Sequence, residues 1–520
     1  MRAALHLLCW TLFSLLAGCA SLPPRGEAPA SAAFTDTHDT PLAHIAAASR
    51  PSGETAPSGF RLLPTGEFAF NARLALARRA ERSLDLQYYH VHRDQAGRLL
   101  LRELRDAAAR GVRVRLLVDD FYAAEIDDLL QGLAAHANVQ VRLFNPLPLR
   151  RGSPLLRLTL SSGDFELHNH RMHNKLFVAD NAVAIYGGRN IADEYFMNSA
   201  QANFIDMDLL STGQVVPELS AAFDRYWNSE LAWPLQTVLG TPHNGEQART
   251  EFDEAVRLAA PPVPAYRLDP LGQTAVEVQL DEGRLALTYG SAAVFADPPE
   301  KAASMTRPTG PSAAMGGLMA AMAEARSEVF IVSPYFVPGN VGMPMMQRAA
   351  AGGVRAIVFT NSLGSTDEPL VHHMYSRYRA EMLRLGVQLY EFSPALTRDS
   401  RLFGYFGRST PRLHAKVALV DRRLLLVGSV NLDARSAIGN TEMGVVINSP
   451  ALAGHFGRLM APDRASTAYK LRLAADGRSI EWTSTDEQGR TTVLTEEPED
   501  SAWQRFKFWL QTLFVDERLL

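Results

Sequence analysis

Two segments of the chain carry the same reactive side chains at the same spacing. They read His173-Asn-Lys175-Leu-Phe-Val-Ala-Asp180 and His414-Ala-Lys416-Val-Ala-Leu-Val-Asp421. Each is followed by a glycine-containing loop that ends in an asparagine, Asn190 in the first case and Asn431 in the second. Both the histidines and the asparagines are 241 residues apart (414 − 173 and 431 − 190). A single His-x-Lys pair is usually an ordinary exposed pair, whereas a duplication in register indicates a functional site.

The residue types in this motif suit a phosphodiester. Residues two apart on a strand project from one face, so the histidine and lysine of each motif are expected to point at one target. Two motifs facing each other would gather two imidazoles, two ammonium groups and two amides. One neutral imidazole can attack phosphorus while the other, protonated, donates to the leaving oxygen, and the lysines neutralise the non-bridging oxygens.

The aspartates of the motif fall where a turn is expected. Asp180-Asn181 and Asp421-Arg422 have the composition of hairpin turns that join two short strands. They complete the predicted catalytic motif, but we interpret Asp180 and Asp421 as turn and ion-pair residues more than as catalysts.

Matching segments outside the motif show that a larger unit is repeated. The strand-like segment after Gly111 corresponds to the one after Gly353, and the segment at Val141 corresponds to the one at Val387. Strands alternate with amphipathic helices in the same order in both halves. This pattern predicts an α/β fold of two tandem α-β-α sandwich halves, related by a pseudo-twofold axis and sharing one active site.

The repeat also predicts how the chain is divided. We expect a first half at 60–240 (motif about 167–194), a connector at 241–300 with a strand at Ala275–Leu287, a second half at 301–462 (motif about 408–435) and a C-terminal extension at 463–520. In the extension, apolar side chains recur at helical spacing from Trp503 to Phe514. We expect an amphipathic aromatic helix there, which either lies at a membrane interface or packs on the body.

Composition narrows the class of protein. The chain has 520 residues, 47% of them hydrophobic and 21% charged, and a net charge of −4. This content predicts large buried cores and excludes a collagenous or mainly disordered chain. The nearly neutral charge argues against a dedicated nucleic-acid binder.

The first residues read as a targeting segment. An apolar run follows Arg2 and ends in Leu16-Ala-Gly-Cys19, which resembles a bacterial lipobox. The resemblance implies a signal peptide at 1–18, lipidation of Cys19, and a membrane-anchored lipoprotein facing the periplasm. Ala20 favours the outer membrane, whereas lipid synthesis would be expected at the inner one. Residues 19–59 are rich in Ala, Pro, Ser and Thr and are predicted to form a flexible tether.

The doubled motif, with its glycine-asparagine loops, resembles the phospholipase D superfamily over residues 60–460. The resemblance implies a phosphohistidine intermediate without a cofactor or metal, with His173 as the nucleophile and His414 as the acid. Asn190 and Asn431 would then bind substrate. It also implies an acidic residue some thirty positions after each histidine that fixes its tautomer. Glu442 fits after His414, and Asp206 fits after His173, with Asp208 as its rival.

Two further groups of histidines allow other interpretations. His168, His170 and His173 fall within six residues, but a strand would direct His173 to the opposite face, which disfavours a metal site. His372 and His373 could line a lipid entrance or form a surface cluster.

Within the superfamily, the chain looks most like bacterial cardiolipin synthases of the third type. This subgroup implies a monomer that transfers a phosphatidyl group between membrane phospholipids, with phosphatidylglycerol as acceptor and phosphatidylglycerol or phosphatidylethanolamine as donor. The alternatives are a hydrolytic phospholipase D, a secreted nuclease and a non-catalytic lipid-binding scaffold. An accessory protein is neither indicated nor excluded.

Overall fold

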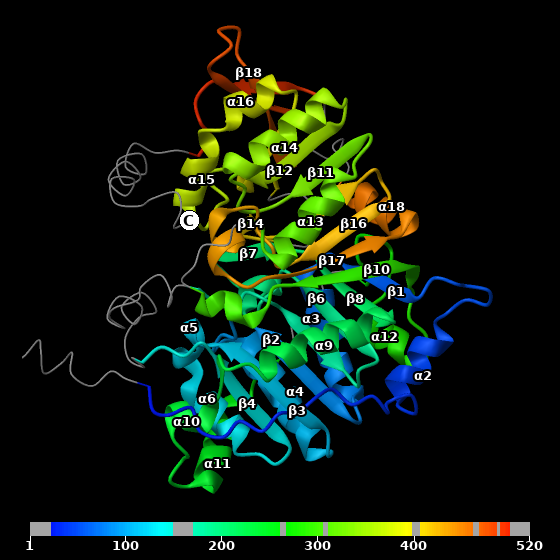
Figure 1. The fold of residues 1–520 in the computed structure, drawn as a ribbon, viewed down its shortest axis with the longest axis vertical. Helices are drawn as coiled ribbons and strands as arrows, with labels where there is room; N and C mark the ends of the chain where they lie inside the picture. Colours follow the sequence, from blue (N-terminus) through cyan, green and yellow to red (C-terminus); the bar gives the residue numbers. More distant parts are fainter. Residues whose placement is uncertain are drawn as a thin grey trace, which may run out of the picture.

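The computed structural model describes residues 22–148, 170–260, 267–304, 310–397, 406–460, 467–485 and 489–499. The two halves lie one above the other along the long axis, the first in blue to green and the second in green to red (Figure 1). Each half is a β-sheet covered by helices, so the predicted α/β fold with a repeated unit is confirmed.

The sheet of the first half has a parallel centre and antiparallel edges. Its strands, in spatial order, are β1 (Ser58–Leu63), β8 (Asp208–Gly213), β6 (Val183–Gly187), β5 (Leu176–Ala179), β2 (Ser83–Tyr88), β3 (Arg113–Asp119), β4 (Val139–Phe144) and β9 (Ala232–Pro234). Its helices are α2 (Pro41–Ala48), α3 (Gly66–Arg79), α4 (Gln95–Ala109), α5 (Asp120–Ala123), α6 (Asp127–Ala134), α9 (Val215–Trp227), α10 (Leu235–Leu239), α11 (Gly245–Val256) and α12 (Val276–Asp281), with short 3₁₀ turns η1 (Ala124–Ile126) and η2 (Asp193–Tyr195).

The sheet of the second half repeats this order. Its strands are β10 (Thr288–Ala296), β17 (Met443–Asn448), β16 (Leu424–Gly428), β15 (Val417–Val420), β11 (Glu328–Val332), β12 (Arg355–Asn361), β13 (Gln388–Phe392), β18 (Ala468–Leu473), β19 (Ile480–Thr485) and β20 (Thr491–Leu494). Its helical segments are η3 (Pro299–Ala303), α13 (Ala313–Ala323), α14 (Gly339–Ala351), α15 (Pro369–Ser376), α16 (Arg379–Arg384), α17 (Pro394–Thr397), the π-helix η4 (Arg435–Gly439) and α18 (Pro450–Leu459).

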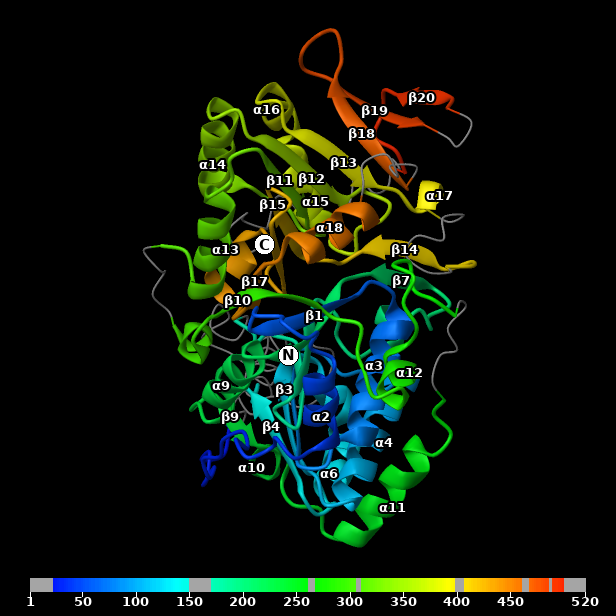
Figure 2. The same ribbon diagram turned by 90° about the vertical axis from the view of Figure 1, so that its right-hand side faces the viewer.

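Strand alternation explains the layers. In β5, Phe177 and Ala179 join the core under α3, α4 and α6, while Leu176 and Val178 face a central core that also contains apolar residues of α9 and α18. The same alternation in β15 divides its side chains between the central core and the outer core under α13 and α14. The central core is thus shared by both halves, and Figure 2 shows them in contact across β1, β10 and β17.

The connector differs from the prediction in one element. Residues Val276–Asp281 form the helix α12, not part of a strand, and the strand of this region is β10. Alternating Val276, Val278 and Leu280 fit either structure. Val276 and Leu280 are buried, whereas Val278 is 42% exposed, which is the one-sided burial of a helix packed on α3.

The segment that precedes β1 is attached to the first half. Arg25 donates to the carbonyl oxygens of Ser229 and Ala232, at 2.8 and 3.1 Å, and Arg142 donates to the carbonyl oxygen of Pro29 at 2.7 Å. Arg113 stacks on the ring of Phe34 at 3.8 Å. The expectation of a flexible tether is therefore wrong for the described residues 22–59, because their backbone satisfies buried arginines of the body.

The C-terminal extension contributes to the second sheet. β18 pairs antiparallel with β13, and β19 and β20 continue the sheet outward. The predicted aromatic helix from Trp503 to Phe514, the signal segment and Cys19 lie outside the described residues. In the part of the chain that the structure describes, no helix combines the length and hydropathy needed to span a bilayer.

Candidate active site

Two short parallel pairings join the halves directly beside the motif histidines. β7 (Ala202–Ile205) pairs with β14 (Thr410–Leu413), so that the residues following each strand, Asp206 and His414, become neighbours. On the other side a bridge between Met172 and Thr441 places His173 beside Glu442 in the same way. The main chain therefore carries each histidine to a carboxylate of the opposite half.

The carboxylate partners are exchanged relative to the sequence prediction. His414 Nδ1 lies 2.6 Å from Asp206 Oδ2, and His173 Nδ1 lies 3.0 Å from Glu442 Oε2. Asp206 and Glu442 do contact the motif imidazoles, but each contacts the histidine of the opposite half, so their assignment to the histidine of the same half is wrong. The rival Asp208 has another role, since it binds the buried guanidinium of Arg73 at 2.9 Å.

Both imidazoles are fixed with one nitrogen available for chemistry. The carboxylate at Nδ1 favours the tautomer with the proton on Nδ1, which leaves the lone pair on Nε2. Burial lowers the pKa of His173 to about 4, although Glu442 opposes the shift, and burial lowers the pKa of His414 well below its ordinary value. Both rings line one cavity of about 250 Å³, and their lowered pKa values favour the neutral form of each ring.

The motif histidines and lysines stand just before β5 and β15, and not within strands as the sequence had suggested. Lys175 Nζ donates to the carbonyl oxygen of His173 at 2.6 Å, and Lys416 Nζ donates to that of His414 at 2.5 Å. Burial lowers the pKa of Lys175 well below its ordinary value and that of Lys416 to about 8. A bound phosphate anion would raise both pKa values and so favour the ammonium form of each lysine.

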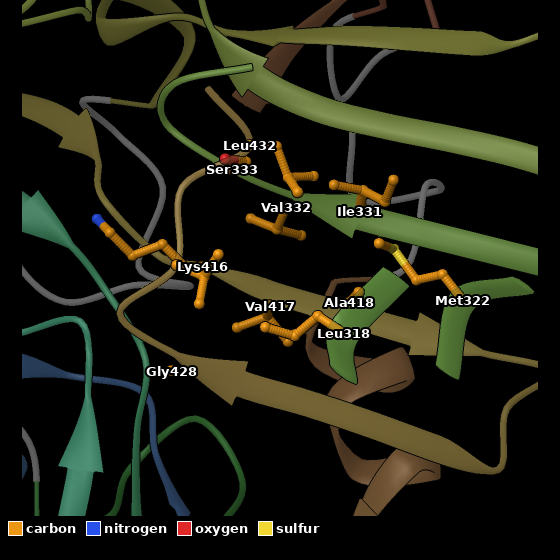
Figure 3. Close-up of a pocket in the computed structure, with 11 residues that line it drawn as sticks. Leu318, Met322, Ile331, Val332, Ser333, Lys416, Val417, Ala418, Gly428 and Leu432 are labelled. Carbon is orange, nitrogen blue, oxygen red and sulfur yellow. The ribbon is translucent and has the colours of Figure 1, made fainter. Parts of the chain in front are cut away.

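The surroundings of Lys416 explain part of the lowering of its pKa. A narrow space of about 20 Å³ lies beside the lysine stem and is bordered mainly by aliphatic side chains of α13, β11 and β15. Figure 3 shows that the amino group of Lys416 points away from these side chains. The amino group also lies 5.9 Å from the ring centroid of Tyr335. The stem is thus held by apolar packing while the charge is directed elsewhere.

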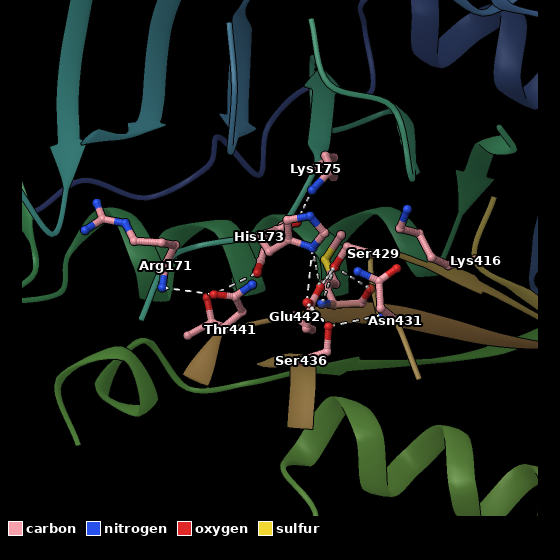
Figure 4. Close-up of polar contacts among 12 residues, drawn as sticks. Arg171, His173, Lys175, Lys416, Ser429, Asn431, Ser436, Thr441 and Glu442 are labelled. Carbon is pink, nitrogen blue, oxygen red and sulfur yellow. Dashed lines mark hydrogen bonds and ion pairs between the residues drawn. The ribbon is translucent and has the colours of Figure 1, made fainter. Parts of the chain in front are cut away.

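The two supporting carboxylates have different surroundings, and Figure 4 shows those of Glu442. Glu442 accepts hydrogen bonds from the hydroxyls of Ser429 and Ser436, at 2.5 and 2.7 Å, in addition to its contact with His173. Burial alone would raise the pKa of Glu442, but its charged and hydrogen-bonded neighbours outweigh this and lower it. Burial raises the pKa of Asp206.

Gly188 occupies the position in the first half that corresponds to Ser429 in the second, and the structure explains why this position has no side chain. A Cβ atom on Gly188 would lie 2.2 Å from Asp206 Oδ1. The missing hydroxyl is therefore a consequence of how closely the Asp206 carboxylate approaches the loop.

Asp180 and Asp421 lie at the hairpin turns, as expected. Asp180 accepts from the backbone N–H groups of residues 81–83, and Asp421 accepts from those of 326–328. Both have positive φ, 52° and 50°. Burial opposes ionisation of Asp421, but the backbone donors prevail and lower its pKa to about 2. These aspartates anchor the starts of β2 and β11, and they do so through backbone donors more than through ion pairs.

Asn190 and Asn431 line the cavity. The amide nitrogen of Asn190 donates to the Tyr195 hydroxyl at 3.1 Å. The amide oxygens of both asparagines are buried and have no hydrogen-bond partner among the described residues. These polar atoms are available to a substrate, in keeping with the predicted binding role.

The remaining histidines do not form a recognised metal site. Among the described residues no group of three or more His, Cys, Asp or Glu side chains is placed to hold a metal, while His168 lies outside them. His372 is buried in α15 and contacts Glu497 Oε1 at 2.7 Å. It is not among the residues that line the active-site cavity.

Several residues of the cavity wall were not singled out from the sequence. They are the aromatic residues Tyr89, Tyr122, Tyr195, Phe204 and Tyr335, the acidic residues Glu194, Asp367, Glu368 and Asp433, and Arg435 and Ser436. The aromatic pairs Tyr88-Tyr89 and Tyr335-Phe336, which end matching segments of the repeat, were the available signal. The acidic residues carry no repeated pattern that could have singled them out.

Comparisons with known proteins agree with this architecture. Residues 74–227 and 318–463 match the family model described as "Cardiolipin synthase, PLD-like domain". The chain is 37% identical over 454 residues to cardiolipin synthase C of Escherichia coli (strain K12), covering 87% of this chain and 94% of that protein. It is 26% identical over 411 residues to a cardiolipin synthase of Geobacillus kaustophilus (strain HTA426), covering 79% and 67%.

A solved structure shows the same fold. The phosphatidylserine synthase of Haemophilus influenzae Rd KW20 aligns with a TM-score of 0.58 and 13% identity, over 90% of this chain and 98% of that one. The site and the duplicated fold define a phospholipase D-like enzyme. The chain belongs to the PLD-like cardiolipin synthase family, which is of the phospholipid phosphatidyltransferase type, and the family resemblance is confirmed.

Proposed function

We propose that this protein makes cardiolipin by transferring a phosphatidyl group to phosphatidylglycerol through a phosphohistidine. The observation that carries the mechanism is the pair of imidazoles in one cavity, each held through Nδ1 by a buried carboxylate. In the first step His173 Nε2 attacks phosphorus, and His414 donates a proton to the leaving oxygen. In the second step His414 accepts the proton of the incoming hydroxyl, and the phosphoramidate bond breaks.

Substrate binding supplies the protonation state that the first step needs. Without substrate both imidazoles are neutral, which suits His173 as nucleophile but not His414 as acid. The negative charge of the phosphodiester raises the pKa of the nearby imidazole and so favours a protonated His414. In this proposal Lys175, Lys416 and the two asparagines bind the non-bridging oxygens and stabilise the developing charge.

The charge of the cavity favours a donor with a cationic headgroup. Glu194, Asp367, Glu368 and Asp433 line it together with the single guanidinium of Arg435. The ammonium group of phosphatidylethanolamine would be attracted by these carboxylates and by the neighbouring tyrosine rings, whereas the neutral glycerol headgroup of phosphatidylglycerol would gain no such attraction. We therefore favour phosphatidylethanolamine as donor and phosphatidylglycerol as acceptor.

The lipid products test this proposal. Vesicles of phosphatidylglycerol and phosphatidylethanolamine should yield cardiolipin in excess over phosphatidic acid, with release of ethanolamine exceeding release of glycerol. Dominant phosphatidic acid would instead favour the hydrolytic phospholipase D. Release of nucleotides from plasmid DNA without added metal would favour the nuclease, and lipid binding without any product would favour the scaffold.

We further propose that Cys19 is lipidated and that the protein is a membrane-anchored lipoprotein of the periplasm. Arg25 is held against the first half, and the six peptide bonds between Cys19 and Arg25 can span at most about 20 Å. A lipid on Cys19 would therefore keep the catalytic body close to the bilayer. Palmitate labelling of the wild type and of Cys19→Ala, followed by membrane fractionation, tests the anchor and distinguishes the outer from the inner membrane.

A further inference from the structure

A second and larger cavity, referred to below as the groove, lies beside the active site. Its volume is about 670 Å³, within the usual range for ligand pockets. It is bordered by α13, by the start of α14 and by the segment 432–438, and apolar side chains such as Met315, Met319 and Ile438 line it. Val341, which is 58% exposed, marks where it reaches the surface.

One wall separates this groove from the catalytic cavity. Within the segment 432–438, Arg435 and Ser436 line the catalytic cavity, whereas Ala434, Ala437 and Ile438 line the groove. Asp433 lines both, so the two spaces meet at that residue. The wall includes the π-helix η4, a rare conformation that often occurs at functional sites. It also bears Ser436, which holds Glu442 in place beside His173.

We propose that this groove binds one acyl chain of the phospholipid whose phosphate occupies the catalytic cavity. The inference rests on the proposed function, which places a phospholipid phosphate between the imidazoles. An acyl chain is the part of that substrate whose chemistry matches an apolar groove adjacent to the catalytic cavity. The two methionines can adapt to chains of different shape, because the thioether side chain is unbranched and flexible.

The groove predicts a dependence on chain length in soluble substrates. Each methylene moved from water to an apolar site contributes about fourfold in affinity. Dihexanoyl-phosphatidylethanolamine, used as donor below its micelle concentration with one fixed phosphatidylglycerol acceptor, should thus exceed the dibutanoyl donor by roughly 16-fold in kcat/KM through the chain in the groove. The effect should appear in KM more than in kcat.

A substitution that fills the groove from the side opposite the catalytic wall tests this prediction. Met319→Trp should reduce the advantage of the dihexanoyl lipid to less than about fourfold and leave turnover of the dibutanoyl lipid unchanged. Met345→Trp is the matched control, because Met345 is also partly buried but lies on α14 outside the groove lining. The control should keep the wild-type dependence. An unchanged dependence in Met319→Trp would overturn the proposal.

Photolabelling gives a readout that does not need turnover. Phosphatidylethanolamine with a diazirine near the end of one acyl chain should label Met315, Met319 or Ile438 in the wild type. Label found only outside the groove would overturn the acyl-chain site. Groove labelling in a protein that forms no cardiolipin would instead leave the site standing and contradict the proposed function.

Discussion

His414 Nδ1 lies 2.6 Å from Asp206 Oδ2, so the imidazole of the second half is oriented by a carboxylate of the first half. His173 and Glu442 form the reciprocal pair. Neither half therefore contains a complete catalytic unit. Each imidazole has its correct tautomer and orientation only when both halves have folded and joined.

The exchanged pairing predicts different defects for the two carboxylates. With a natural lipid, Asp206→Asn and Glu442→Gln should each lower kcat by about 10³- to 10⁴-fold, as expected when an imidazole loses its orienting carboxylate. A p-nitrophenyl phosphodiester needs no proton on its leaving group. With it, Asp206→Asn should still form the phosphohistidine and accumulate it, whereas Glu442→Gln should form little. The opposite result would favour pairing within each half.

Trapping the intermediate tests the roles of the histidines. His414→Ala with the p-nitrophenyl substrate should carry label on His173, bound through a phosphoramidate that is labile in acid and stable in base. Peptide mapping by mass spectrometry locates it. Label that requires His414 and survives in His173→Ala would reverse the two roles.

The two motif lysines should not tolerate arginine. Each amino group is buried and donates to the carbonyl oxygen of its neighbouring histidine. The guanidinium is larger and has a fixed planar geometry. Lys175→Arg and Lys416→Arg should each lower kcat by at least about 100-fold, near 3 kcal/mol. Lys470→Arg, at an exposed position of β18, is the control. Normal turnover in either motif variant would mean that charge alone suffices.

The loop asymmetry predicts unequal effects of exchanging Gly188 and Ser429. Gly188→Ser places a Cβ against the Asp206 carboxylate, which must move away from His414, and kcat should fall by about 100-fold or more. Ser429→Gly removes one hydrogen bond to Glu442 and should cost roughly tenfold. Equal losses in kcat, measured for both variants, would contradict this explanation of the glycine.

The turn aspartates should contribute to stability and little to catalysis. Asp180→Asn should lower the free energy of unfolding by about 2 kcal/mol while kcat per folded molecule stays near wild type. For Asp421, whose pKa is lowered in the folded state, the contribution is present above its unfolded pKa and disappears as the pH falls through about 2. The difference in Tm between wild type and Asp421→Asn should therefore vanish in strong acid. A large loss of kcat in either variant would restore a catalytic role.

The sequence by itself determined that the chain contains a repeat and which side chains of the repeat could react. The common offset of 241 residues places His173 and His414 before equivalent strands. The turns at Asp180 and Asp421 were predictable because turn composition is a local property. Local patterns were less decisive around Val276, where the same alternation of apolar residues is compatible with a strand or a helix.

Only the tertiary structure decided which carboxylate serves which histidine. Asp206 is 208 residues from His414 but only 33 from His173, so proximity in sequence indicates the wrong partner. The pairing of β7 with β14 and the bridge between Met172 and Thr441 decide the matter, because they bring the two halves together at the motif itself. Composition likewise predicted a free tether before residue 60, whereas buried arginines of the body bind its backbone. Contacts between distant segments depend on how the cores dock, and no local pattern of residues encodes that arrangement.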